Sequence, residues 1–131
     1  KSAGERIQIS FTPILVSMER GILAVNTAKL KAGTTLELAH QVWADAYGDE
    51  QFIKVYPKGE FPSTADTIGD NNALIGLAID EHADRLVAVC AIDNLVKGTG
   101  GAAIQSMNIA LGLPENTGLT AISLAKNGAK K

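Results

Sequence analysis

The chain is poor in the residues and patterns that mark several large classes of protein. A single cysteine excludes an internal disulfide and suits a reducing cytoplasm. No apolar run approaches the roughly 20 residues that a membrane-spanning helix needs, and the polar residues 1–6 lack the apolar core of a signal peptide. The net charge of −2 gives no electrostatic case for binding nucleic acid or an anionic membrane. We therefore expect a cytoplasmic protein that binds neither nucleic acid nor membranes.

The chain also lacks a credible set of catalytic or metal-binding side chains. His40 and His82 are its two histidines, and neither has metal-ligand spacing with the other or with Cys90. Cys90 lies within an apolar run with no nearby cation to lower its pKa, so we interpret it as a small buried side chain rather than a nucleophile. We expect no metal site and no catalytic residue in this chain.

The composition fits a single globular domain. Hydrophobic residues make up 46% of the 131 positions and charged residues 20%, which is typical of a soluble domain. A chain of this length buries about two-thirds of the surface that it exposes when unfolded, so it can form a sizeable core.

Hydrophobic periodicity predicts more strands than helices. Strands are predicted at residues 7–12, 21–30, 53–56, 73–80 and 85–92, the last two joined as a hairpin by residues 81–84. Helical spacing predicts helices at residues 36–47 and 99–111, the first opened by a capping box at residues 34–37. Because the strands cluster rather than alternate with helices, the sequence predicts an α+β fold with a mixed, mostly antiparallel sheet and few helices.

Residues 91–108 hold the densest set of chemical groups. An apolar strand ends there at Asp93 and Asn94 and passes into a glycine-rich helix start. Backbone N–H groups at such a start have no intrahelical partner, so an anion or an amide can sit there, and Gly98 allows close approach. Asn94 has the donor and acceptor atoms to read a carboxamide, but it is also a residue type that caps helices. Lys97 is a weaker candidate for pairing with a phosphate, because a lysine near a helix start is usually just solvated.

Arg20 is the second candidate for a binding role. It lies between a strand that Pro13 ends and the glycine at position 21. Its planar, permanently charged guanidinium suits a carboxylate or phosphate of an acidic substrate. The alternative is a surface salt bridge with a neighbour such as Glu19.

Separated motifs carry a family resemblance. Residues 93–98 are DNLVKG, residues 11–13 are FTP, residues 20–23 are RGIL, and residues 112–115 are GLPE. In this order they resemble the N-acetyl-gamma-glutamyl-phosphate reductases, enzymes of arginine biosynthesis. The resemblance extends roughly from residue 9 to residue 119, which is nearly the whole chain.

The resemblance implies a fold and a division of the chain. The fold would be that of the C-terminal domain of glyceraldehyde-3-phosphate dehydrogenase and the semialdehyde dehydrogenases. Residues 1–92 would form the substrate and dimerisation domain, and residues 93–131 a turn, helix and tail that return to the dinucleotide-binding domain. That nucleotide-binding half, the nucleophilic cysteine and the catalytic histidine would all precede Lys1. The missing start methionine also suggests a fragment, which we expect to be inactive alone.

The resemblance further implies the roles of individual residues and partners. The parent enzyme would use NADP and a cysteine thioester to reduce an acyl phosphate to N-acetylglutamate semialdehyde. Asn94 would lie beside the nicotinamide, Gly98 would bind cofactor or only pack, and Arg20 would border the substrate. Ile14 falls where many relatives carry histidine, so no proton chemistry is expected from it. The family also implies a homo-oligomer, at least a dimer, formed through the sheet of this domain.

Two alternatives stay open on the sequence. One is a related acyl-phosphate reductase of the aspartate-semialdehyde dehydrogenase type, which shares an Asn-Leu-x-x-Gly turn. The RGIL run and the GLPE ending favour the arginine-pathway enzyme over it. The other is a stand-alone dimerisation or regulatory module with no chemistry of its own.

Overall fold

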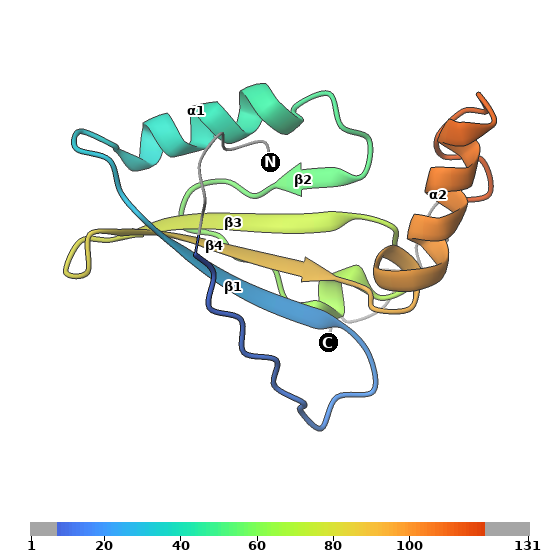
Figure 1. Cartoon of the computed structure of the whole chain (residues 1–131), viewed down its shortest axis with the longest axis horizontal. Helices are drawn as coiled ribbons and strands as arrows, with labels where there is room; N and C mark the ends of the chain where they lie inside the picture. The colour runs from blue at the N-terminus through green and yellow to red at the C-terminus, as the bar shows by residue number, and fades with distance from the viewer. Residues whose placement is uncertain (1–7, 120–131) are drawn as a thin grey trace, which may run out of the picture.

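A four-stranded sheet in the order β1-β4-β3-β2 forms the centre of the structure, which is a computed structural model describing residues 8–119 (Figure 1). Helix α1 lies along the sheet and α2 stands beyond one end of it. In chain order the elements are β1 (Ile22–Lys29), α1 (Leu36–Tyr47), β2 (Ile53–Val55), the 3-10 helix η1 (Thr64–Thr67), β3 (Ala73–Asp80), β4 (Arg85–Ile92), the π-helix η2 (Val96–Gly100) and α2 (Gly101–Ala110).

The pairing of the strands confirms the predicted mixed, mostly antiparallel sheet. Strands β3 and β4 form an antiparallel hairpin with bounds identical to those predicted, and β1 pairs antiparallel with the other edge of β4. Among the strands of residues 8–119, only β2 runs parallel to its neighbour, β3. Asp80 closes the hairpin loop, because its Oδ1 accepts hydrogen bonds from the backbone N–H groups of His82 and Ala83.

Helix α1 covers one face of this sheet. Its Leu36 and Trp43 pack against the buried core residues Ile75, Leu77 and Ala88 of β3 and β4. The helix begins at Leu36, as predicted, but Thr35, not Thr34, is its N-cap and accepts a hydrogen bond from the Leu38 N–H. The predicted capping box therefore does not form, because it requires the cap at the first of its four residues.

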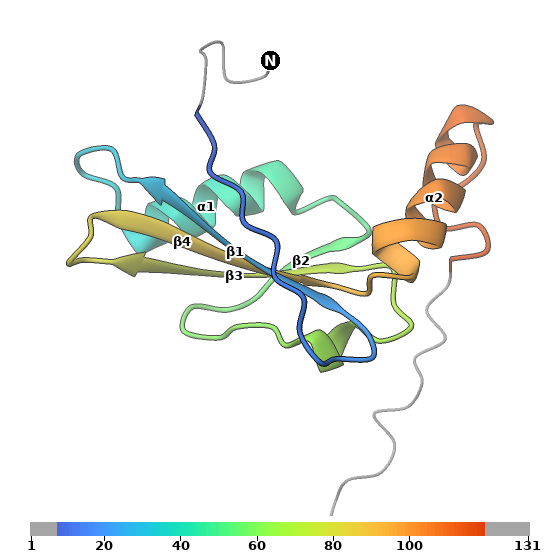
Figure 2. The ribbon, with the colours of Figure 1, turned by 60° about the horizontal axis from the view of Figure 1, so that its bottom comes forward.

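The opposite face of the sheet is only partly covered. Figure 2 shows α1 on one side and the loop that carries η1 on the other. The loop lies close to the backbone at Gly76, where a Cβ would stand 2.8 Å from Glu60 O and from Phe61 Cδ1. On β1, the side chains of Leu23 and Val25 stay 49% and 62% exposed. Glycine at position 76 thus lets the loop cover the centre of the sheet, while its β1 edge remains bare.

The strand predicted at residues 7–12 is wrong over its described part. Residues 8–12 have no ladder partner, and their apolar side chains, including Ile9 and Phe11, are exposed. Alternating apolar residues describe an amphipathic extended segment, but a strand also needs a neighbour with which to exchange hydrogen bonds. The helix predicted at residues 99–111 forms in two parts, the end of η2 and then α2. Within residues 8–119, no helix is both long and apolar enough to cross a membrane.

Candidate functional site

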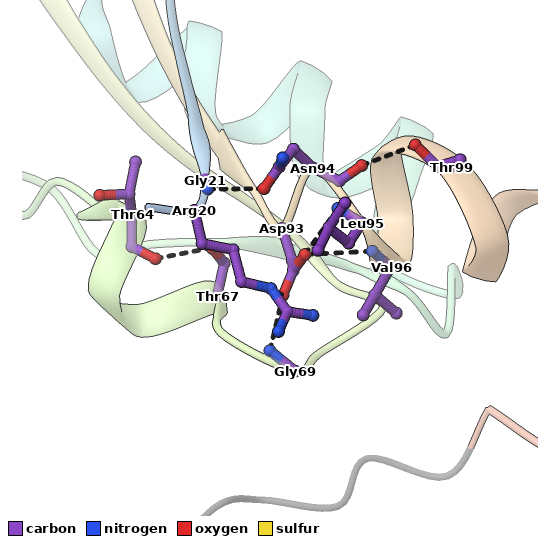
Figure 3. Close-up of polar contacts among 10 residues, drawn as sticks. All are labelled: Arg20, Gly21, Thr64, Thr67, Gly69, Asp93, Asn94, Leu95, Val96 and Thr99. Atoms are coloured by element: carbon purple, nitrogen blue, oxygen red, sulfur yellow. Dashed lines mark hydrogen bonds and ion pairs between the residues drawn. The ribbon is translucent and has the colours of Figure 1, made fainter. Parts of the chain in front are cut away.

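A buried carboxylate, that of Asp93, lies where β4 ends. Its Oδ1 accepts hydrogen bonds from the backbone N–H groups of Leu95 (2.8 Å) and Val96 (3.0 Å). Its Oδ2 accepts one from the Gly69 N–H (2.7 Å) and lies 2.8 Å from Arg20 Nε in an ion pair (Figure 3). The side chain is 0% exposed. Asp93 therefore joins three segments that are distant in the sequence.

The same contacts keep this carboxylate ionised. Burial by itself raises the pKa of Asp93, but the hydrogen bonds from Gly69, Val96 and Leu95 and the contact with Arg20 act in the opposite direction and prevail. The net effect is a pKa below the ordinary value of an aspartate.

The predicted anion site at the helix start is filled by the protein itself. The first N–H groups, those of Leu95 and Val96, donate to Asp93. The next glycine N–H groups donate to carbonyls five residues back, Gly98 to Asp93 (2.9 Å) and Gly100 to Leu95 (3.0 Å). The expectation that an external anion sits on these groups is therefore wrong. The carboxylate of Asp93 itself supplies the negative charge that a helix start favours.

Asn94 does not cap the helix but bonds to the residue just before β1. Its Oδ1 accepts a hydrogen bond from the Gly21 N–H (2.7 Å), and its backbone carbonyl accepts one from Thr99 Oγ1 (2.7 Å). Because the Gly21 N–H is a donor, the atom facing it must be the oxygen, which fixes the orientation of the amide. Among residues 8–119, the amide nitrogen of Asn94 has no hydrogen-bond partner.

Arg20 and Asn94 line one open cleft of about 770 Å³ at this end of the sheet. Residues 14–16 and 18–23 line it together with Ser63 and Thr64 of the η1 loop. Arg20 pairs with the buried Asp93 rather than with Glu19, and its side chain remains 32% exposed. The structure thus brings together two of the predicted site residues, although 73 residues separate the bonded pair Gly21 and Asn94.

Gly98 and Lys97 do not line this cleft. A Cβ at Gly98 would meet only ordinary contacts, 3.4 Å from Asp93 O and 3.5 Å from Ile92 Cδ1, so packing does not demand glycine there. Its role beside a cofactor stays a prediction. Lys97 donates from Nζ to Gln105 Oε1 (2.8 Å) and lies 5.5 Å from the centroid of the Phe52 ring, on the side of α2.

Neither a reactive cysteine nor a metal site is found in the described part of the chain. Cys90 packs against the core cluster under α1, and burial raises its pKa, which disfavours the thiolate. Over residues 8–119, no group of three or more His, Cys, Asp or Glu side chains has the arrangement to hold a metal ion.

A family model described as the semialdehyde dehydrogenase dimerisation domain matches residues 1–94. The chain belongs to this family. Its sheet and its α1 layer are the architecture that the sequence resemblance implied. The semialdehyde dehydrogenase match ends at Asn94, so it includes both Arg20 and the end of β4.

Curated relatives of this semialdehyde dehydrogenase domain carry the name N-acetyl-gamma-glutamyl-phosphate reductase, which confirms the resemblance. The protein of Pseudarthrobacter chlorophenolicus is 58% identical over 118 residues, which are 90% of this chain and 34% of the relative. Those of Saccharopolyspora erythraea and Leifsonia xyli are 52% and 54% identical, covering 95% and 89% of this chain and 36% and 34% of their own lengths. The chain spans about a third of the length of these relatives.

Asp93 is the residue of this semialdehyde dehydrogenase domain that sequence reasoning missed. The sequence pattern places it beside Asn94 and assigns it no role of its own. A signal was present, because an ionisable residue directly after an apolar strand and before a helix start is a natural cap for the first N–H groups. What the sequence did not contain was its second set of partners, Arg20 and Gly69, which only the fold brings to it.

Proposed function

We propose that this chain is the C-terminal part of an NADP-dependent N-acetyl-gamma-glutamyl-phosphate reductase. The parent enzyme acts in the cytoplasm, in arginine biosynthesis. The observation that carries the proposal is the meeting of Arg20 and Asn94 at one cleft, in a chain 50–58% identical to relatives of that name. An anion-binding fork beside a carboxamide-reading amide suits an acidic substrate next to a nicotinamide.

The reaction divides one difficult reduction into two steps. A cysteine thiolate from outside this chain attacks the acyl carbon, forming a carbon–sulfur bond and breaking the bond to the phosphate oxygen. NADPH, when bound, supplies the hydride that reduces the resulting thioester. The semialdehyde leaves as the carbon–sulfur bond breaks and the electron pair returns to the cysteine sulfur.

Asn94 suits the role of holding the nicotinamide amide. Its oxygen is occupied by the Gly21 N–H, so the free amide nitrogen would donate to the carboxamide oxygen of the cofactor. The fixed orientation also means that little rotamer freedom is lost on binding. We assign Gly98 to the border of the cofactor, because a residue without a side chain allows close approach. Its N–H already donates to the Asp93 carbonyl oxygen.

Arg20 would bind the substrate through the far end of its guanidinium. Its Nε forms an ion pair with Asp93, and within residues 8–119 its two terminal nitrogens have no hydrogen-bond or ion-pair partner. Two parallel N–H groups match the oxygens of a phosphate or a carboxylate. Both anionic groups occur in an N-acetylglutamyl phosphate, so either one fits this arginine.

The exposed apolar surfaces support two partners. Leu23 and Val25 on the bare edge of the sheet suit a second copy of the chain, giving at least a dimer. Ile104 and Met107 on α2 suit the nucleotide-binding half of the same enzyme, to which residues 93–131 would return. Residues 120–131 of that segment lie outside the described residues.

Substrate choice tests the proposal against its alternatives. The full-length protein that contains this chain is purified, and NADPH oxidation is followed with N-acetylglutamyl phosphate and with aspartyl phosphate. We expect turnover with the acetylated substrate. Preference for aspartyl phosphate would favour an enzyme of the aspartate-semialdehyde dehydrogenase type, and the absence of turnover with both would favour a non-catalytic dimerisation module.

A further inference from the structure

We infer that Asp93 is a positioning residue for Arg20: its buried carboxylate forms an ion pair with Nε (2.8 Å) and thereby fixes where the guanidinium of this cleft-lining arginine lies. The inference rests on the proposed function, because it assigns to Asp93 a part in binding the anionic group of the substrate. It extends that function to a residue that is buried and has no place in the cleft lining itself.

The burial of Asp93 excludes direct contact with substrate. Its side chain is 0% exposed, and both oxygens are engaged, Oδ1 by two backbone N–H groups and Oδ2 by Gly69 and Arg20. Any effect of Asp93 on substrate binding must therefore act through the groups that it holds.

The carboxylate is a rigid support for the arginine. Backbone N–H groups of two separate segments, at Gly69 and at Leu95 and Val96, fix the plane of the carboxylate (Figure 3). A long arginine side chain at the surface samples many rotamers unless one end is held. Anchoring Nε on a buried, immobile partner selects among these rotamers before substrate arrives, which lowers the entropic cost of binding.

Charge and geometry make opposite predictions at this position. Asp93 is ionised, and its negative charge lies 2.8 Å from Arg20, so it weakens the attraction of the arginine for an anion. If Arg20 worked by charge alone, removing the charge of Asp93 would tighten substrate binding. If Asp93 positions the fork, removing it loosens binding instead.

The test is the substitution Asp93→Asn in the full-length enzyme. An asparagine keeps one oxygen for Leu95 and Val96, but its NH2 group faces the two donors Gly69 and Arg20 and cannot accept from them. We expect the KM for N-acetylglutamyl phosphate to rise about tenfold or more, the loss expected for a charge-assisted contact, while the KM for NADPH changes less than about twofold.

A matched control is available in Asp80→Asn. Asp80 also ends a strand and caps a turn by accepting two backbone N–H groups, but in the described part of the chain no arginine pairs with it. We expect both KM values of this variant to equal those of the wild type. The reverse reaction identifies the anionic group: a raised KM for inorganic phosphate assigns the phosphate, and a raised KM for the semialdehyde assigns the carboxylate.

A double substitution separates positioning from a merely structural role. If Asp93 acts through Arg20, the KM of Arg20→Ala with Asp93→Asn is no higher than that of Arg20→Ala alone. Additive losses, or an unchanged or lowered KM in folded Asp93→Asn, would overturn the inference. If Asp93→Asn does not fold, the substitution Arg20→Lys is the test, because a single ammonium cannot both pair with Asp93 and form a bidentate contact with the substrate. A wild-type KM for N-acetylglutamyl phosphate in Arg20→Lys would also overturn the inference. Absence of reductase activity in the wild type would instead defeat the proposed function, and the inference with it.

Discussion

Two neighbouring residues directly after β4, Asp93 and Asn94, make different kinds of contact. Asp93 points into the protein and collects backbone N–H groups and Arg20, while Asn94 bonds across to Gly21 and lines the cleft. The division follows from their chemistry. A buried carboxylate offers only acceptors, so it suits a place surrounded by donors, whereas an amide fixed by its oxygen still has donors left for a ligand.

The role of Asn94 is testable with a pair of substitutions in the full-length enzyme. Asn94→Asp keeps an oxygen for the Gly21 N–H but removes the NH2 donors, so we expect a KM for NADPH raised about fivefold, equivalent to roughly 1 kcal/mol. The melting temperature should change little. Asn94→Ala removes both functions and should lower the melting temperature as well. Wild-type KM values in both variants would exclude Asn94 from the cofactor site.

The ion pair of Asp93 makes the free energy of unfolding depend on pH. The folded pKa lies below the ordinary 3.8, so the stabilisation is fully present above about pH 4 and is lost as the pH falls towards the lower folded pKa. We expect the difference in melting temperature between wild type and Asp93→Asn to be constant above pH 5 and to shrink as the pH falls to 3. Thermal melts by circular dichroism measure it, and a difference independent of pH would contradict a depressed pKa.

At the scale of the elements, the passage from β4 to α2 depends on one glycine. The π-helix η2 turns the chain away from the sheet, and Gly101 then packs against the loop before β3. A Cβ at Gly101 would collide with Asn71 Oδ1 and stand 2.8 Å from Val96 O. At Gly100, which has the same helical backbone, a Cβ would meet only Leu95 O at 3.4 Å.

Alanine substitutions at these two glycines should therefore differ. We expect Gly101→Ala to lower the free energy of unfolding by about 1–3 kcal/mol, because a rigid neighbour must move. Gly100→Ala should be neutral or stabilising by less than about 1 kcal/mol, because alanine restricts the unfolded chain. Urea denaturation of both variants measures the difference. Equal stabilities would show that the contact of Gly101 with Asn71 adapts without cost.

At the scale of the whole molecule, the apolar surface is uneven. Helix α1 and the η1 loop cover most of the sheet, but the β1 edge, α2 and residues 9–18 present apolar side chains to solvent. Exposed apolar side chains gathered in this way mark surfaces that bind other proteins. The family name, a dimerisation domain, agrees with such a surface.

The chain should therefore self-associate through the bare edge of the sheet. We expect sedimentation velocity at micromolar concentration to show a dimer, and Val25→Lys to shift it towards monomer, because a charge would be buried in the contact. Val42→Lys on the outer side of α1 is the control, since Val42 is similarly exposed, at 56%, but on the opposite layer. A wild-type monomer at every concentration, or equal effects of both substitutions, would disprove this interface.

Local residue patterns settled the elements whose signals are complete within a few residues. The β3–β4 hairpin and the span of α1 agree with prediction. The spacing of apolar residues, the turn residues and the residues at the helix ends that predict them all lie within or next to the element concerned. The same patterns identified Arg20 and Asn94 as candidates, each from its own chemistry.

The tertiary structure alone decided which distant segments and side chains contact each other. It leaves residues 8–12 without a strand partner, runs β2 parallel to β3, and carries the η1 loop across the second face of the sheet. Above all, it brings Arg20 and Gly69 to the carboxylate of Asp93. These contacts join segments dozens of residues apart, and a pattern confined to neighbouring residues holds no information about which distant groups folding will bring together.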